Sequence, residues 1–191
     1  MRIIAGKWKG RQLAPFQGAA IRPTSDKVRG AIFSALSSAL EARGLAWEDL
    51  RVLDLYAGSG ALALEALSRG APEALLVESD AKALSLIAKN AALAGAKDSL
   101  VCRRSRVAGW FEQVGDDGPF NLVLADPPYG HGEAARVLEL ISRSARVPPG
   151  SLLVVERGSK EGELPAPVGL GRIQIRVYGD TAVEFFEKIK T

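Results

Sequence analysis

The chain has 191 residues, enough for one sizeable hydrophobic core and too few for two independent ones. Hydrophobic residues make up 47% of it and charged residues 25%, as is ordinary for a soluble globular domain. One cysteine, Cys102, and one histidine, His131, exclude an internal disulfide framework and speak against a zinc site. Cys102 follows an apolar pair in the strand-like run 100–102, which predicts a buried, inert thiol. Without an apolar run of about 18 residues or a secretory signal, we expect a cytoplasmic protein with no membrane contact and no bound metal.

Positive charge is concentrated near the N-terminus. Residues 1–30 hold seven basic residues and one acidic residue, a net charge of +6, whereas the whole chain carries +3. This distribution indicates a segment that binds a polyanion, joined to a near-neutral body; the alternative is a chance cluster of solvated surface charges. Trp8 and Phe16 could either stack on bases or hold this segment against the core. The candidate phosphate contacts are Lys7, Lys9, Arg11, Arg22, Lys27 and Arg29.

The first 44 residues predict a small hairpin followed by a helix. Strand-like pieces at 2–4 and 11–13 flank two glycines. Residues 24–26, Thr-Ser-Asp, offer an N-cap, and apolar residues at a spacing of four from Val28 to Leu40 predict a helix that stops by Gly44. We therefore expect a basic extension, residues 1–44, and a second domain, residues 45–191.

From residue 51 onward, predicted strands alternate with predicted helices, which indicates a parallel sheet covered on both faces. The predicted strands are 52–56, 74–78, 99–103, 120–125 and 152–156, and the predicted helices are 61–69, 81–94, 107–113 and 133–146. The last two strands, 172–178 and 182–189, are joined by a turn too short for a parallel connection. The expected fold is a seven-stranded, doubly wound, Rossmann-like α/β sheet that ends in an antiparallel hairpin.

A glycine-rich turn, Asp54-Leu55-Tyr56-Ala57-Gly58-Ser59-Gly60, joins the first of these strands to the next helix. Glycines there let a ligand approach the backbone at the carboxyl end of the sheet, where such folds bind ligands. The Asp54 carboxylate would repel a pyrophosphate but suits a cationic sulfonium that carries an amino-acid group. The turn therefore favours S-adenosylmethionine. The alternatives are an NAD site, with Ala63 at the third glycine position, and a plain tight turn.

Glu78 ends the second predicted strand, 18 residues beyond Gly60. A carboxylate at this place can accept hydrogen bonds from both ribose hydroxyls of an adenosine-containing cofactor. Because S-adenosylmethionine and NAD both contain adenosine, Glu78 supports a cofactor site without choosing between them.

The tetrad Asp126-Pro127-Pro128-Tyr129 directly follows the strand at 120–125. Its prolines restrict the backbone and remove two amide donors, which leaves the carbonyls there able to accept hydrogen bonds. A nucleobase amino group is a poor nucleophile, and acceptors at Asp126 and the Pro127 carbonyl would aim its lone pair at a methyl group. Tyr129 offers a face on which a flipped base could stack, worth roughly 1–3 kcal/mol. The tetrad thus predicts methyl transfer to an exocyclic amino nitrogen; the alternative is a turn that merely ends a strand.

The tetrad resembles the signature of methyltransferases that act on amino groups, and the chain from residue 2 to about 187 resembles the bacterial ribosomal RNA guanine-N2 methyltransferase family known as RsmD. Besides the glycine-rich turn and the tetrad, the resemblance rests on Arg2-Ile3-Ile4-Ala5-Gly6, Lys9-Gly10-Arg11, Arg22-Pro23-Thr24 and Asp26-Lys27-Val28-Arg29. The chain departs from the family at Gly30, where relatives usually carry Glu. It departs again at Arg103-Arg104-Ser105-Arg106, where many relatives place an acidic residue or Asn near the adenine amino group.

The resemblance implies a methyltransferase that uses S-adenosylmethionine to modify N2 of a guanine in small-subunit ribosomal RNA, within an assembling subunit; we expect a monomer. The implied cofactor residues are Asp54, Tyr56, Ala57, Gly58, Gly60, Glu78, Ser105 and Asp126, the catalytic residues Asp126, Pro127 and Tyr129, and Thr24 joins the basic residues on the RNA side. Three alternatives stay open: an adenine-N6 methyltransferase on DNA or RNA, an NAD-dependent oxidoreductase, and a non-catalytic RNA-binding assembly factor.

Overall fold

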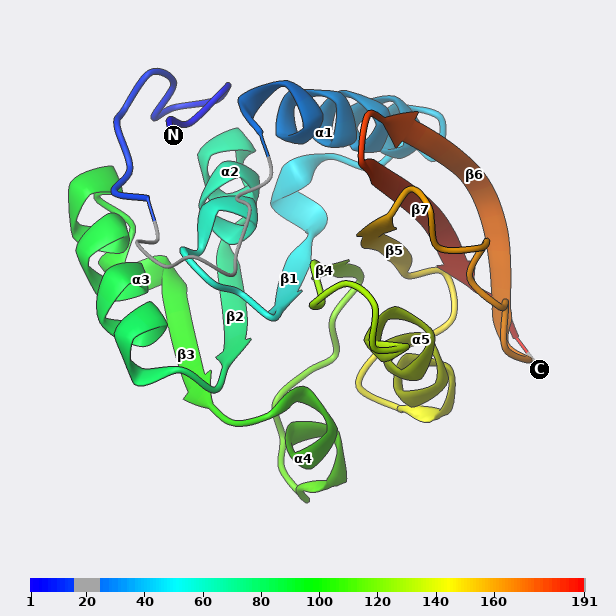
Figure 1. The fold of residues 1–191 in the computed structure, drawn as a ribbon. Coiled ribbons are helices and arrows are strands. Elements are labelled where there is room, and N and C mark those ends of the chain that lie inside the picture. The colour runs from blue at the N-terminus through cyan, green and yellow to red at the C-terminus, as the bar shows by residue number, and fades with distance from the viewer. Residues whose placement is uncertain (16–24, 191) are drawn as a thin grey trace.

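The computed structural model describes residues 1–15 and 25–190, and these contain a seven-stranded sheet of order β3-β2-β1-β4-β5-β7-β6 (Figure 1). The strands are β1 (Arg51–Leu55), β2 (Glu73–Glu78), β3 (Leu100–Arg104), β4 (Leu122–Ala125), β5 (Leu152–Gly158), β6 (Leu170–Tyr178) and β7 (Thr181–Lys188). The α-helices are α1 (Asp26–Glu41), α2 (Ala61–Arg69), α3 (Ala81–Ala94), α4 (Val107–Glu112) and α5 (Glu133–Arg143). Phe16, Arg22 and Thr24, named above, lie outside the described residues.

The sheet confirms the predicted architecture. Strands β3, β2, β1, β4 and β5 are parallel, and β7 pairs antiparallel with both β5 and β6. The order of the strands reverses between β1 and β4, and in such sheets ligands bind outside the carboxyl ends at that reversal. The glycine-rich turn leaves β1 and the Asp-Pro-Pro-Tyr tetrad leaves β4, so the topology brings the two motifs together.

Helices cover both faces of the sheet, with α1, α2 and α3 on one face and α4 and α5 on the other (Figure 1). Successive side chains of a strand point to opposite faces. Val52 and Leu76 accordingly pack in the cluster with α1–α3, whereas Leu53 and Val77 pack with α4 and α5. Because β1, β2, β4 and β5 are buried on both sides, they read as largely apolar runs in the sequence, whereas β3 at the edge is mostly exposed.

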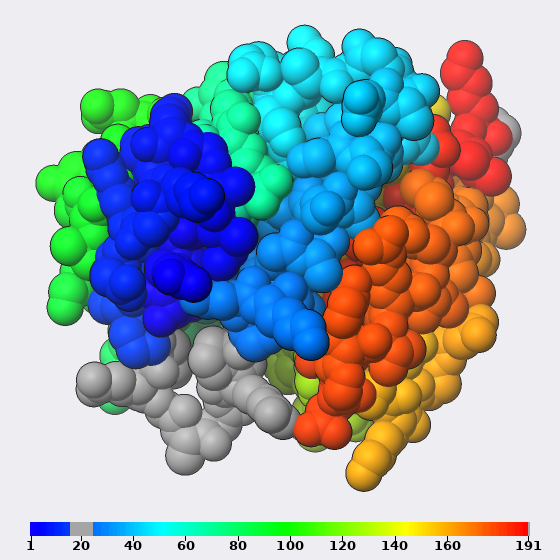
Figure 2. Space-filling model, turned by 90° about the horizontal axis from the view of Figure 1, so that it is seen from above, coloured from blue at the N-terminus to red at the C-terminus, as the bar shows by residue number. Residues whose placement is uncertain are grey.

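The N-terminal segment packs into the same core as the helices. Its hairpin is reduced to one bridge, between Arg2 and Gln12. Trp8 is only 9% exposed and joins the cluster of α1 and α2, so it holds the segment on the core and presents no free face to a base. Figure 2 shows this segment, in dark blue, lying beside α1 and α2. The following helix begins as predicted: the Ser25 hydroxyl oxygen accepts a hydrogen bond of 3.2 Å from the Val28 N–H.

The prediction of a buried Cys102 was wrong. The apolar run 100–102 forms part of β3, an edge strand of the sheet, and the Cys102 side chain is exposed. Partial desolvation, and after it the negative charge of Asp54, raise the pKa of the thiol. The thiol therefore remains protonated near neutral pH, which makes it a poor nucleophile.

The predicted helix at 133–146 ends three residues early, at Arg143, because Ser144 adopts an extended conformation. Among the described residues, none of the helices has the length and apolar character needed to cross a membrane.

Candidate cofactor and acceptor site

Three carboxylates meet at the carboxyl ends of neighbouring strands: Glu78 on β2, Asp54 on β1 and Asp126 directly after β4. Burial raises the pKa of Asp54 well above its usual value. A hydrogen bond from Ala63 opposes this rise, and the charges of Asp126 and Glu78 add to it. The charges of Asp126 and Glu78 therefore place negative potential at Asp54, which favours a cation over a phosphate.

The glycine-rich turn is fixed to both β2 and α2. The Gly58 N–H donates a hydrogen bond of 2.9 Å to the Oε2 atom of Glu78, and Oδ2 of Asp54 accepts one of 3.0 Å from the Ala63 N–H in the first turn of α2. Both Gly58 and Gly60 have left-handed backbones, with φ of 54° and 75°.

The two glycines of the turn have different neighbours. A Cβ added to Gly58 would have the Tyr56 carbonyl oxygen, 3.8 Å away, as its nearest neighbour, so this side of the turn is open to a ligand. A Cβ on Gly60 would lie 3.3 Å from Leu76 and 3.4 Å from Ile87. Gly60 therefore lets α2 pack closely, and Gly58 leaves room for a ligand.

Tyr56 connects the cofactor turn to α5. It is a non-glycine residue with φ of 59°, a conformation that costs energy and persists where the surroundings enforce it. Its hydroxyl donates a hydrogen bond of 2.9 Å to Oε2 of Glu133, the first residue of α5. Burial, followed by this bond, raises the pKa of Tyr56 far above its usual range, so the phenol stays a donor.

Ser105 lies beside Glu78, because the Ser105 N–H donates a hydrogen bond of 3.0 Å to the Glu78 carbonyl. Its hydroxyl donates to the Arg106 carbonyl at 3.0 Å. The hydroxyl oxygen keeps lone pairs with which it could accept the expected hydrogen bond from the adenine amino group. Arg103, in the same run, forms a two-pronged ion pair with Asp117 over 3.0 and 2.8 Å. Its side chain is therefore engaged with Asp117.

The Asp-Pro-Pro-Tyr tetrad leaves β4 next to the cofactor turn, since Ala125 pairs with Leu55. Asp126 is half-buried and Pro127 is buried, whereas Tyr129 is 40% exposed. The Tyr129 hydroxyl lies 3.3 Å from that of Thr181. Desolvation raises the pKa of Tyr129 to about 12, so the ring is neutral at any physiological pH and is partly open for stacking.

Residues 4–8 of the basic segment are held on α2 by two side chains, those of Glu65 and Ser68. The fully buried carboxylate of Glu65 accepts hydrogen bonds from the N–H groups of Ile4 and Ala5, at 2.7 and 3.1 Å. The Ser68 hydroxyl donates to the Ala5 carbonyl at 2.6 Å and accepts from the Trp8 N–H at 3.0 Å.

Gly6 is required at the point where the segment touches α2. A Cβ there would lie 1.9 Å from the Ser68 carbonyl oxygen. Together with the Glu65 and Ser68 bonds, this close approach makes the segment a rigid part of the surface.

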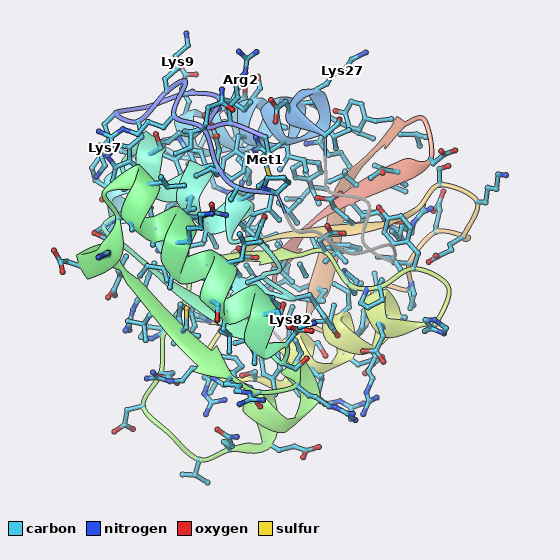
Figure 3. All side chains as sticks on the ribbon, turned by 60° about the vertical axis from the view of Figure 1, so that its left-hand side comes forward. Met1, Arg2, Lys7, Lys9, Lys27 and Lys82 are labelled. Atoms are coloured by element: carbon cyan, nitrogen blue, oxygen red, sulfur yellow. The ribbon has the colours of Figure 1, made fainter. Side chains whose placement is uncertain are left out.

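The basic residues of the segment divide into exposed and engaged ones. Arg2, Lys7, Lys9 and Lys27 are exposed, although Arg2 also pairs with Asp26 over 3.5 Å, and Figure 3 shows Arg2, Lys9 and Lys27 projecting away from the sheet on one side of the molecule. Lys7 lies over the Trp8 ring, 4.5 Å from its centroid. Arg11 is exposed but donates to the Ala94 carbonyl.

The prediction that Arg29 contacts RNA was wrong. Its side chain is 1% exposed, bonds Asp26 at 2.9 Å and lies 4.0 Å from the buried carboxylate of Glu65. It also donates to the Arg2 carbonyl. Position 29 lies on the face of α1 that packs against the core, so its charge stabilises the N-terminal segment and does not reach a ligand.

The sequence patterns missed the residues that hold the motifs in place. Each of these hydrogen bonds spans 31 residues of sequence or more, so no local pattern reports it. The residues concerned are Glu65, Ser68, Glu133 and Thr181, described above, together with Asn90, whose side chain donates to the Ser59 carbonyl at 2.9 Å, and Glu161, which accepts from the Gly130 N–H at 2.7 Å. Within 1–15 and 25–190, no group of three or more His, Cys, Asp or Glu side chains could hold a metal ion.

Comparisons with known proteins cover almost the entire chain. The family model described as "Conserved hypothetical protein 95" matches residues 1–187. The chain is 32% identical over 188 residues to "Ribosomal RNA small subunit methyltransferase D" of Escherichia coli (strain K12), covering 98% of this chain and 90% of that protein.

Solved structures show the same fold. The yhhF protein of Escherichia coli has a TM-score of 0.83 and 32% identity, covering 99% of this chain and 98% of that one. An RNA methyltransferase from Salinibacter ruber, solved in complex with S-adenosyl-L-homocysteine, has a TM-score of 0.63 at 16% identity and covers 89% and 95%. At that identity the likeness concerns the fold alone.

Proposed function

Because this chain belongs to the RsmD family, matched by the model described as Conserved hypothetical protein 95, we propose that it methylates the exocyclic N2 of a guanine in small-subunit ribosomal RNA. At the coarser level, membership of this family makes it an rRNA methyltransferase that uses S-adenosylmethionine. One observation supports methyl transfer to an exocyclic amino nitrogen: an acid-lined, glycine-rich turn and an Asp-Pro-Pro-Tyr tetrad lie side by side at the carboxyl ends of β1 and β4. The choice of guanine N2 rests on membership of the family.

The residues present fit S-adenosylmethionine, which when bound supplies a methyl group on a positively charged sulfur. The buried Asp54 carboxylate and the nearby charges of Glu78 and Asp126 favour such a cation and would repel the pyrophosphate of NAD. Gly58 leaves space beside the turn, and the Glu78 carboxylate keeps room for a donor from the ribose. In this proposal Tyr56, Ala57 and Gly60 shape the turn, and Ser105 accepts from the adenine amino group.

On the acceptor side, Asp126 and the Pro127 carbonyl would accept hydrogen bonds from the amino group and direct its lone pair toward the methyl carbon. Tyr129 would stack on the flipped base. Holding the two reacting atoms at attack distance is worth up to about 7–11 kcal/mol of the barrier, so positioning supplies most of the acceleration.

We propose that Lys7, Lys9 and Lys27 bind backbone phosphates of the RNA, with Arg2 and Arg11 as weaker contacts because Arg2 also pairs with Asp26 and Arg11 donates to the Ala94 carbonyl. Since the backbone of the segment is fixed on α2, it would present these charges without the cost of ordering the backbone. Four further points remain expectations. They are RNA contacts of Arg22 and Thr24, the assembling subunit as substrate, a monomeric state and a cytoplasmic location.

Analysis of methylated nucleosides tests the proposal. Small-subunit rRNA from cells that lack the protein should lose one N2-methylguanosine, and the purified protein should restore it on small-subunit particles. Appearance of N6-methyladenosine instead would establish the adenine-N6 alternative. Calorimetry should show binding of S-adenosylhomocysteine, whereas micromolar binding of NAD without it would support the oxidoreductase.

A further inference from the structure

The segment after the tetrad is held from the far end of the chain. The Gly130 N–H donates a hydrogen bond of 2.7 Å to the Oε1 atom of Glu161, in the connection between β5 and β6. One residue earlier, the Tyr129 hydroxyl pairs with the hydroxyl of Thr181, the first residue of β7, over 3.3 Å. Tyr129 and Gly130 belong to the loop formed by the tetrad and Gly130, which we call the acceptor loop. These two adjacent residues are thus bonded to two separate segments, the connection between β5 and β6 and the start of β7.

The anchor of Glu161 is rigid. The buried Arg157 guanidinium bonds Glu184 at 2.6 Å and donates to the Glu161 carbonyl at 2.7 Å. Glu184 is itself fully buried and also accepts from the Leu164 N–H at 3.0 Å. The Glu161 carbonyl and the Leu164 N–H are therefore fixed to the β5–β7 pair by charge-assisted hydrogen bonds, which are among the stronger ones in proteins.

Space around this contact is limited. A Cβ added to Gly158 would lie 3.0 Å from Oε1 of Glu161 and 3.5 Å from the Tyr129 ring. The glycine thus lets the carboxylate and the ring lie close to β5. An exposed loop that only needed to end a strand would require neither the glycine nor the carboxylate.

We propose that Glu161 and Thr181 are positioning residues for methyl transfer: they hold Gly130 and Tyr129, and so set the place of the Asp126 carboxylate and of the stacking ring. The inference rests on the proposed function, in that the tetrad receives the acceptor base. It adds that the antiparallel end of the sheet, which lies away from the cofactor turn, determines how the acceptor is presented. Misplacement of a reacting group by about 1 Å can cost about 100-fold in rate.

The test compares matched variants of the full chain on small-subunit particles. Glu161→Ala removes the acceptor for Gly130, whereas Glu161→Gln keeps an oxygen in its place. Glu163→Ala is the control, since this exposed neighbour pairs with Arg172 and does not contact the tetrad. We expect Glu161→Ala to lower kcat about 10- to 100-fold, with Glu161→Gln and Glu163→Ala within about threefold of the wild type. Thr181→Val should show a smaller loss, and Thr181→Ser should restore activity.

Two readouts separate positioning from general stability. Affinity for S-adenosylhomocysteine should stay within about threefold in every variant, and the amide of Gly130 should lose its protection from hydrogen exchange in Glu161→Ala but keep it in Glu161→Gln. A Glu161→Ala enzyme with normal kcat would overturn the proposal, as would a Glu161→Gln enzyme equally impaired, or a loss of cofactor affinity that matches the loss of rate.

The identity of the product separates this inference from the proposed function. If the wild type forms a methylated nucleoside other than N2-methylguanosine, the guanine assignment fails, while the ratios among the variants still decide the role of Glu161. The exchange of the Gly130 amide needs no activity at all.

Discussion

The Gly58 N–H donates its hydrogen bond to the same side chain, Glu78, that accepts from the N–H groups of Ser79 and Asp80 through its other oxygen. One carboxylate therefore joins the cofactor turn after β1 to the loop after β2. Because a carboxylate offers about four lone-pair positions, three backbone donors leave room for a further donor from a ligand.

Replacing Glu78 by Ala should weaken S-adenosylhomocysteine binding at least about tenfold, because it removes the proposed ribose acceptor and leaves the Gly58 N–H without its partner. Calorimetry provides the measurement. Glu73→Ala, at the opposite and exposed end of β2, is the control and should bind normally. Equal affinities for the two variants would contradict the assigned role.

Asp126→Ala should abolish turnover and leave affinity for S-adenosylhomocysteine within a few-fold, since the main role proposed for Asp126 is at the acceptor amine. Asp126→Asn keeps an acceptor oxygen and should retain part of the rate. Single-turnover methylation measures both. Near-normal turnover of Asp126→Ala would show that the tetrad does not act as proposed.

The stability of the wild type should depend on Asp54 in a defined direction. Burial raises the pKa of Asp54 in the folded state above its unfolded value of about 3.9, so the folded state binds the proton more tightly. This contribution to stability is present at low pH and is lost as the pH rises through the folded pKa.

Asp54→Asn lacks this titration and keeps an oxygen for the Ala63 N–H. Its free energy of unfolding, relative to the wild type, should therefore increase as the pH rises from 4 to 8, while its affinity for S-adenosylmethionine falls. Urea unfolding at a series of pH values provides the measurement, and a difference that does not change with pH would refute the assignment.

Replacing Lys7, Lys9 and Lys27 together by Ala should reduce the salt dependence of RNA binding, by at most about one unit of slope for each lost phosphate contact. S-adenosylmethionine binding and the modified nucleotide should not change, because phosphate contacts do not specify sequence. Binding at several salt concentrations tests this. An unchanged slope would make the segment a structural cover of α2 only.

Arg29→Leu should affect the stability of the fold and not the binding of RNA. It removes a buried guanidinium beside Asp26 and Glu65, and breaking a buried charge pair of this kind costs about 3–5 kcal/mol. The variant should melt at a lower temperature and keep the salt slope of the wild type when assayed below its transition. A stable protein with a reduced slope would return Arg29 to the RNA-binding set.

The sequence by itself determined the succession of strands and helices along the chain. It also determined the glycine-rich turn, the tetrad and the antiparallel end of the sheet. Helices α2 and α3 have the predicted bounds, since local glycines and an N-cap mark their ends and these signals act within a few residues. The antiparallel pairing of β6 and β7 is also a local property, because the link between them is too short for a parallel connection.

Only the tertiary structure decided which of two neighbouring basic residues is available: Lys27 is exposed, whereas Arg29, two positions later on α1, is buried against Glu65. It also placed β3 at the edge of the sheet and so exposed Cys102, and it brought Glu161 and Thr181 to the acceptor loop. These outcomes depend on the order of the strands within the sheet and on contacts between segments that are distant in the sequence. Periodicity and spacing report only the conformation of residues close together in the chain, and so they could not reveal them.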